Sequence, residues 1–145
     1  MNQYPDFSIS DLVEILLPKL QIAIAEEALQ YGEYRGGFAV GFKDDKWNLH
    51  TVISIVNPEF PSRWGHRNDQ YDLYAGLKLS TALRFEASTV RLSSENAPLM
   101  AVHPGGVTKY HEGFGVWIGI AYSGHHGEED QDLALKMLNR FFFNE

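Results

Sequence analysis

Histidine, lysine and glycine supply the candidate chemistry of this sequence. His103 is followed by Pro104, Gly105 and Gly106. In such a loop the proline fixes one backbone dihedral, while the glycines permit positive φ or a close approach of the backbone to a ligand. We predict that the imidazole and the exposed N–H groups of this loop line a cleft for a flat or anionic ligand. A tight connection between two strands, with a surface histidine, fits the same residues equally well.

A lysine in an otherwise apolar helical pattern is the candidate cation. Lys78 could pair with a carboxylate of a ligand, and Thr81 would add a hydroxyl group one helical turn away. More commonly, such a lysine packs its aliphatic stem on apolar surface while its ammonium group reaches solvent, or it forms a structural ion pair.

A second group of polar residues runs from Ser123 through His125 and His126 to the acidic pair Glu129 and Asp130. Imidazole and carboxylate ligands suit zinc or iron, but adjacent histidines diverge and seldom bind one metal. A solvated loop that caps the final helix is the favoured interpretation. Ser123 is kept among the candidate ligand-binding residues, and the role of the two histidines stays open.

Several common reaction classes lack their residues. The sequence has no cysteine, which excludes disulfides, thiolate metal sites and a cysteine nucleophile. No Gly-x-Ser-x-Gly elbow and no phosphate-binding glycine loop with its lysine and hydroxyl is present. Catalytic turnover therefore stays undecided.

Composition limits the partners. A chain of 145 residues has the size of one domain, expected over 1–145. Its formal charge of -7 argues against nucleic-acid binding. The apolar run from Gly115 to Tyr122 is far shorter than the roughly 20 residues of a membrane-spanning helix, so we expect no membrane association. Because Met1 to Phe7 lacks the features of a signal peptide, a cytoplasmic location is expected.

The elements that must position these residues follow from apolar spacing and turn residues. Helices are predicted from Ser8 to about Tyr31 with a kink or restart at Pro18, from Asp69 to Glu86, and from Glu128 onward. Strands are predicted over Gly37–Phe42, Asn48–Ile55, Thr89–Leu92, Val107–Tyr110 and Gly115–Tyr122. In the second helix, either Leu73 and Leu77 or Ala75 and Leu79 can face inward. Hairpin connections indicate an α+β fold with a central antiparallel sheet of about five strands flanked by helices.

Four motifs occur in the order found in one known family. They are Ala75, Lys78, Thr81, Ala82 and Phe85; Pro104-Gly105-Gly106-Val107; Gly115 through Ile118-Gly119-Ile120 to Ser123-Gly124; and Glu129-Asp130-Gln131-Asp132 with Ala134. From Gly37 to the C-terminus the chain resembles the GlcG/HbpS-like family, also called the haem-degrading-domain family. Thr108 stands where the family usually has proline. The resemblance implies a profilin-like fold, a homo-oligomer and, in some members, haem as the ligand.

Three functions remain open. The first is an oligomer that holds haem or a comparable small ligand between the second helix and the Gly105-Gly106 loop, with Lys78 as anion partner and His103 as candidate axial ligand. The second is an enzyme that acts on a small acid or aldehyde, with His103 or His125 as acid-base group. The third is an interaction module in which apolar edges and the aromatic end 141–143 pack against another subunit.

Overall fold

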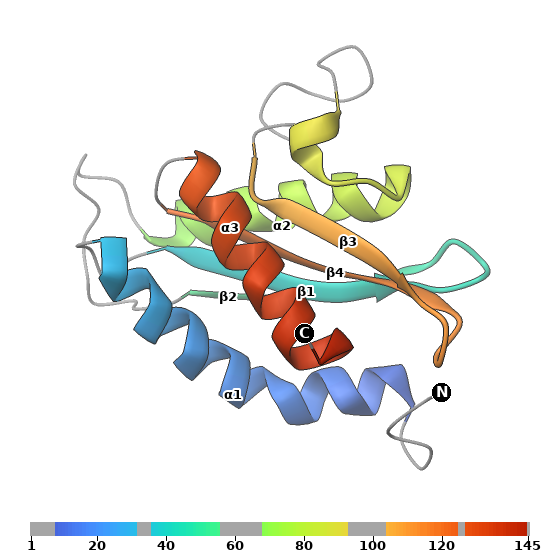
Figure 1. Ribbon diagram of the computed structural model, residues 1–145. Coiled ribbons are helices and arrows are strands. Elements are labelled where there is room, and N and C mark those ends of the chain that lie inside the picture. Colours follow the sequence, from blue (N-terminus) through green and yellow to red (C-terminus); the bar gives the residue numbers. More distant parts are fainter. Residues whose placement is uncertain (1–7, 32–35, 56–67, 93–103, 125–126, 145) are drawn as a thin grey trace.

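The computed structural model describes residues 8–31, 36–55, 68–92, 104–124 and 127–144 (Figure 1). Its helical elements are α1 (Ile9–Ala28), the 3-10 turn η1 (Leu29–Tyr31), α2 (Asn68–Phe85), the 3-10 turn η2 (Thr89–Arg91), α3 (Gly127–Leu138) and the π-helical turn η4 (Asn139–Phe143). Its strands are β1 (Gly37–Lys43), β2 (Leu49–Ile55), β3 (Gly106–His111) and β4 (Val116–Ser123).

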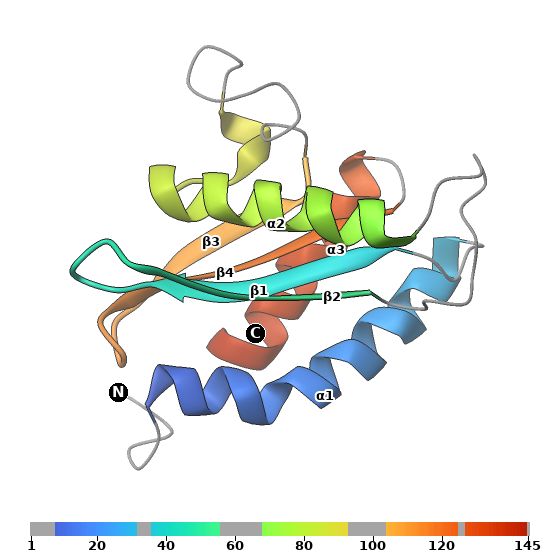
Figure 2. The ribbon, with the colours of Figure 1, turned by 180° about the vertical axis from the view of Figure 1, so that it is seen from behind.

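The four strands form one antiparallel sheet in the order β2-β1-β4-β3. Helix α2 covers one face of the sheet, and α1 and α3 cover the other (Figures 1 and 2). The prediction of an α+β fold with a central antiparallel sheet flanked by helices is confirmed. Strands β2 and β3 are the two edges, and β3 borders the candidate site.

The number of strands differs from the expected five. Thr89–Leu92 does not form the predicted short strand, because residues 89–91 make the 3-10 turn η2. The hydroxyl group of Thr89 accepts a hydrogen bond from the Gly106 N–H at 3.1 Å and donates one to the Gly106 carbonyl at 3.4 Å. A threonine side chain thus takes the place of a neighbouring strand at this point. Among the described residues, β3 is consequently an edge strand.

The central strands are buried on both faces of the sheet, and the side chains of β1 are larger on one face than on the other. On the face toward α1 and α3, Phe38, Val40 and Phe42 alternate with the small residues Ala39 and Gly41, which face α2. The small residues let α2 lie close to the sheet. This close contact fixes the position of the residues that α2 carries.

The helices resolve two points that the sequence left open. Helix α1 begins after Ser8, whose hydroxyl accepts from the Asp11 N–H at 3.1 Å, and it continues through Pro18 while its axis curves (Figure 2). In α2 the buried residues are Ala75, Leu79, Ala82 and Leu83, so Leu73 and Leu77 face outward.

The aromatic end of the chain belongs to the core. Phe142 is 1% exposed, and Phe141 and Phe143 are partly buried against the same core. Because Phe141 and Phe143 keep part of their surface exposed, the expectation that this aromatic end packs against another subunit stays a prediction. None of the described helices combines the length and apolar character that a membrane span requires.

Candidate functional site

Lys78 lies at the centre of a buried polar cluster. Its ammonium group donates to the Tyr122 carbonyl oxygen at 3.2 Å and lies 3.3 Å from a carboxylate oxygen of Asp130. Lys78 and Asp130 are 5% and 3% exposed. The cluster therefore connects the middle of α2 with the end of β4 and the first turn of α3.

Burial and charge act on Lys78 in opposite directions. Burial lowers the pKa of Lys78 because it disfavours the charged amine, and the neighbouring Asp130 carboxylate raises the pKa in part compensation. Asp130 also sits in the first turn of α3, where the helix dipole favours negative charge. This is a structural ion pair, the alternative that the sequence left open for Lys78.

The glycine loop packs directly on this lysine. Gly105 has a φ of +133°, and a Cβ atom there would lie 2.8 Å from the Lys78 Nζ atom and 2.5 Å from the Tyr122 carbonyl oxygen. A Cβ atom on Gly106 would lie 2.6 Å from the Lys78 carbonyl oxygen. The glycine pair and the lysine-bearing helix are neighbours in space, but the lysine side chain fills the space beside the loop.

The other predicted site residues are only partly placed together. Thr81 and Ser123 are buried, 6% exposed each, and Ser123 ends β4 opposite Gly37. His103, His125 and His126 lie outside the described residues. The Lys78 ammonium group already has two acceptors, the Tyr122 carbonyl oxygen and Asp130, with which a ligand carboxylate would compete.

The ligand-binding role of these residues therefore stays a prediction. Among the residues that the structure describes, no three histidine or acidic side chains come together in a way that could hold a metal ion.

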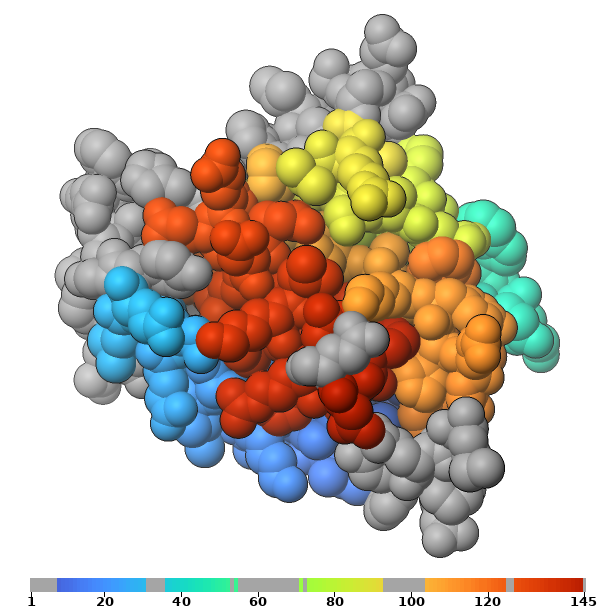
Figure 3. All heavy atoms as spheres, in the orientation of Figure 1, coloured from blue at the N-terminus to red at the C-terminus, as the bar shows by residue number. Residues whose placement is uncertain are grey.

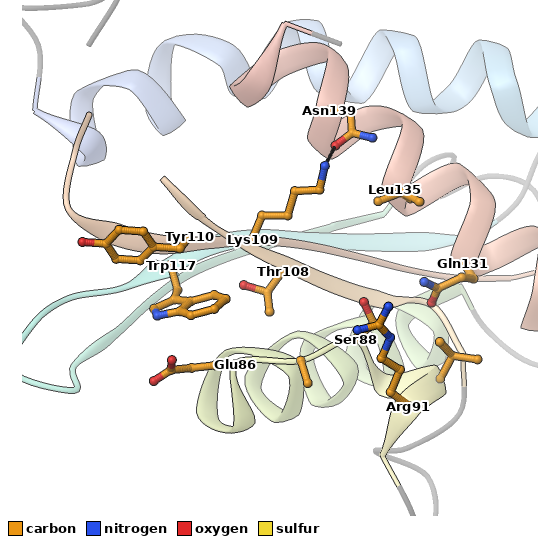
Figure 4. Close-up of a pocket in the computed structure, with 12 residues that line it drawn as sticks. Glu86, Ser88, Arg91, Thr108, Lys109, Tyr110, Trp117, Gln131, Leu135 and Asn139 are labelled. Atoms are coloured by element: carbon orange, nitrogen blue, oxygen red, sulfur yellow. Dashed lines mark hydrogen bonds between the residues drawn. The ribbon is translucent and has the colours of Figure 1, made fainter. Parts of the chain in front are cut away.

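A groove that the sequence did not predict lies between η2, β3 and α3 (Figures 3 and 4). Its volume is about 660 Å³, within the range of small-ligand sites. Its lining includes cations, aromatic and aliphatic residues, and acidic or neutral polar residues. They are Arg91 and Lys109; Tyr110 and Trp117; Val90 and Leu135; and Glu86, Ser88, Thr108, Gln131 and Asn139. It combines apolar surface with a few polar groups.

The two ends of the groove differ in charge. Figure 4 shows Arg91 beside Gln131 at one end, and Glu86 below the rings of Trp117 and Tyr110 at the other. The Glu86 carboxylate is 2.6 Å from the ammonium group of Lys43, so its charge is already compensated. The cationic end is thus the better place for an anion.

Tyr110 and Trp117 form the aromatic corner of the groove, at the end where Glu86 lies (Figure 4). Tyr110 and Trp117 are opposite each other on β3 and β4, with ring centroids 5.6 Å apart and an angle of 65° between the rings. Tyr110 is 48% exposed. The exposed ring surface can contact a flat ligand.

The glycine loop and the groove are connected. The Gly105 N–H donates to the Gln131 side-chain oxygen at 3.3 Å, and Gln131 also lines the groove. Lys109 donates to the Asn139 side-chain oxygen at 2.6 Å, which joins β3 to the end of α3. Of the predicted site residues, Gly105 therefore contacts the wall of the groove directly.

Comparison with known proteins agrees with this architecture. No protein-family model and no curated protein matches the chain. A crystal structure of a PduOC:heme complex matches with a TM-score of 0.56 and 21% identity, over 84% of this chain and 88% of that one. The Ybr137w protein matches with a TM-score of 0.58 and 18% identity, over 95% of this chain and 79% of that one. The chain shares its fold with both structures, as the resemblance to the GlcG/HbpS-like family implied. At these identities the similarity concerns the fold, as the sequence motifs implied.

The buried ion pair yields the first prediction. Asp130→Ala would leave the Lys78 ammonium group in the interior without its counter-ion, and we expect a loss of about 3–5 kcal/mol in the free energy of unfolding. The double variant Lys78→Met/Asp130→Leu should recover most of this loss, because it replaces both charges with apolar groups. Urea denaturation measures both effects.

Lys136→Ala is the matched control, because it breaks the more exposed pair between Lys136 and Glu27 at 2.8 Å. We expect a loss under about 1 kcal/mol for this surface pair. If Asp130→Ala costs no more than the control, the Lys78 cluster does not have the structural role described above.

Proposed function

We propose that this protein binds a small organic anion with a flat, largely apolar part, and that haem is the first candidate. The observation that carries the proposal is the groove, in which the exposed cation Arg91 and the aromatic corner of Tyr110 and Trp117 face one volume of about 660 Å³. Among the described residues, no carboxylate forms an ion pair with Arg91. An arginine in this position suits a carboxylate of a ligand.

Haem can be compared with the groove group by group. Its propionates need cations, of which Arg91 is the exposed one in the lining, and its macrocycle needs apolar contacts, which Trp117 and Leu135 offer. Its iron needs an axial ligand, and a tyrosine oxygen can fill that role. Tyr110 is the residue of this kind among the described lining residues, which include no histidine and no methionine. When bound, haem would supply the iron chemistry, while the protein would supply position and charge.

Two further lines support a ligand of this class. A protein with the same fold is known in a structure described as a heme complex. The sequence also offers His103 as candidate axial ligand and Lys78, Thr81, Gly105, Gly106 and Ser123 as ligand contacts. Gly105 is joined to the groove through Gln131, so a ligand in the groove would lie close to the loop that the sequence singled out.

Haemin titration followed by the Soret band tests this proposal. We expect saturable binding to the wild type and a roughly 10- to 100-fold higher Kd in Arg91→Ala, because a hydrogen bond to a charged group is removed. Tyr110→Phe should shift the Soret band, because the phenol oxygen is lost as an iron ligand. Arg84→Ala, which removes an exposed arginine outside the groove, should bind haemin as the wild type does.

Three results would contradict the proposal or part of it. The groove is the wrong site if Arg91→Ala and Arg84→Ala bind haemin alike. His103 is not the axial ligand if the Soret band is unchanged in His103→Ala. If haemin does not bind, and native mass spectrometry of the purified protein finds no retained small molecule, the binding function itself is contradicted.

We also propose that the protein self-associates through exposed apolar side chains on its helices. Ile15, Ile22 and Leu29 are 47%, 62% and 57% exposed and recur every seven residues along α1 and η1. Residues at this spacing lie on one side of a helix. The aromatic end of the chain, in contrast, is packed inward.

Light scattering coupled to size-exclusion chromatography measures the assembly. We expect a mass that is a multiple of the 16.4 kDa chain, and a shift toward the monomer in Ile22→Glu. Lys19→Glu, also exposed on α1, controls for the added charge. A wild-type monomer at micromolar concentration would refute this proposal.

A further inference from the structure

We propose that the groove also accepts an extended peptide, which adds a strand to the sheet along β3. This inference does not rest on haem binding, because the main-chain groups of β3 carry it and haem does not need them. Arg91 would serve either ligand. The occupant we infer is a short acidic segment of another protein.

The register shows which groups of β3 face the groove. The Gly105 carbonyl oxygen accepts from the Tyr122 N–H at 2.9 Å, and the His111 carbonyl oxygen accepts from the Gly115 N–H at 2.8 Å. Odd-numbered residues therefore pair toward β4. Because hydrogen-bonding direction alternates along an antiparallel strand, the even-numbered residues direct their N–H and C=O groups away from β4.

Thr89 shows that the outward side can be paired. Gly106 is the first even-numbered residue of β3, and both of its outward groups bond to the Thr89 hydroxyl. Thr89 is fully buried, so this contact closes the beginning of the edge. The next outward residues, Thr108 and Tyr110, both line the groove. No main-chain group among the described residues pairs with their N–H or C=O groups.

The edge also lacks most of the features by which proteins block strand addition. Strand β3 contains no proline, and its one lysine, Lys109, is directed toward Asn139 on the α3 side. An edge whose N–H and C=O groups have no main-chain partner is the template for an added strand. Tyr110 is 48% exposed and Thr108 is 9% exposed, so Tyr110 is the more accessible of the two outward residues. Thr108 and Tyr110 each offer one main-chain N–H donor and one C=O acceptor, so together they form a short recognition site.

The walls of the groove favour a single strand over a second copy of the sheet. Turn η2 stands on one side of β3 and helix α3 on the other, and both line the groove (Figures 3 and 4). A second copy of this chain would carry the same two walls beside its own β3. An extended peptide has no such layers and can lie between them.

Charge and apolar surface indicate the chemistry of the peptide. Arg91 is the exposed cation at one end of the groove, and it suits an acidic side chain. Val90, at 53% exposed, and Leu135, at 36%, offer contacts to aliphatic side chains. Since side chains alternate along a strand, a segment that alternates acidic and β-branched residues meets both requirements.

A fluorescein-labelled pentapeptide of alternating glutamate and valine, with amidated C-terminus, is the probe. Fluorescence anisotropy compares its binding to Tyr110→Pro and Tyr110→Ala. Both variants lack the phenol group. Only the proline also removes the main-chain N–H group of residue 110, which points away from β4 and makes no hydrogen bond to that strand. We expect a Kd roughly 3- to 10-fold higher for Tyr110→Pro than for Tyr110→Ala, the effect of one hydrogen bond.

A second measurement uses the wild-type protein, so it does not depend on the folding of either variant. The same peptide, N-methylated at alternate residues so that it cannot donate to β3, should lose binding. A peptide with lysine in place of glutamate should bind less tightly than the acidic one.

The proposal is overturned by equal affinity of Tyr110→Pro and Tyr110→Ala, by equal binding of the N-methylated peptide, or by no binding of the acidic peptide at millimolar concentration. It is also overturned if light scattering shows that Tyr110→Pro, but not Tyr110→Ala, dissociates an oligomer. In that case the edge pairs with a second copy of the chain.

Discussion

The close contact between the Gly105-Gly106 loop and the buried Lys78–Asp130 pair is the constraint on which the rest of the structure depends. It joins α2, the end of β4 and the start of α3 in one small volume. A side chain at either glycine would meet the lysine or main-chain atoms. The buried charges require each other, since neither is easily accommodated alone in the interior. The contact therefore fixes where β3 begins and how α3 is placed beside it.

The groove follows from this arrangement. Strand β3 leaves the glycine loop as an edge strand, and Thr89 holds η2 against its first residue. Helix α3 starts at the ion pair and runs along the opposite wall, where Asn139 accepts from Lys109. The space that remains between these walls exposes Arg91, two aromatic rings and part of the main chain. Buried polar residues thus shape the groove, while different and more exposed residues would supply the binding chemistry that we propose for it.

The sequence predicted the elements well because their apolar periods are clear. The apolar run predicted as β1 and the apolar spacing of α2 are both found in the fold, and the glycine loop does lie on the lysine-bearing helix. Thr89–Leu92 was predicted wrongly because its β-branched content resembles a strand, whereas the Thr89 side chain competes for main-chain bonds. The groove could not be predicted from one segment, because its residues come from η2, β3, β4 and α3. The hairpin prediction contained one signal that could have found it: a register placing Tyr110 opposite Trp117.

The central claim is that binding occurs in the β3 groove and that the Lys78 cluster is structural. Two-dimensional ¹H–¹⁵N NMR during titration with zinc protoporphyrin IX, a diamagnetic counterpart of haem, tests it most directly. The account predicts that the largest shift changes occur at the Thr108 and Tyr110 amides and the Trp117 indole N–H, all of which line the groove. Largest changes at Thr81 and Ser123, with the groove signals unmoved, would contradict it and place the ligand at the lysine instead.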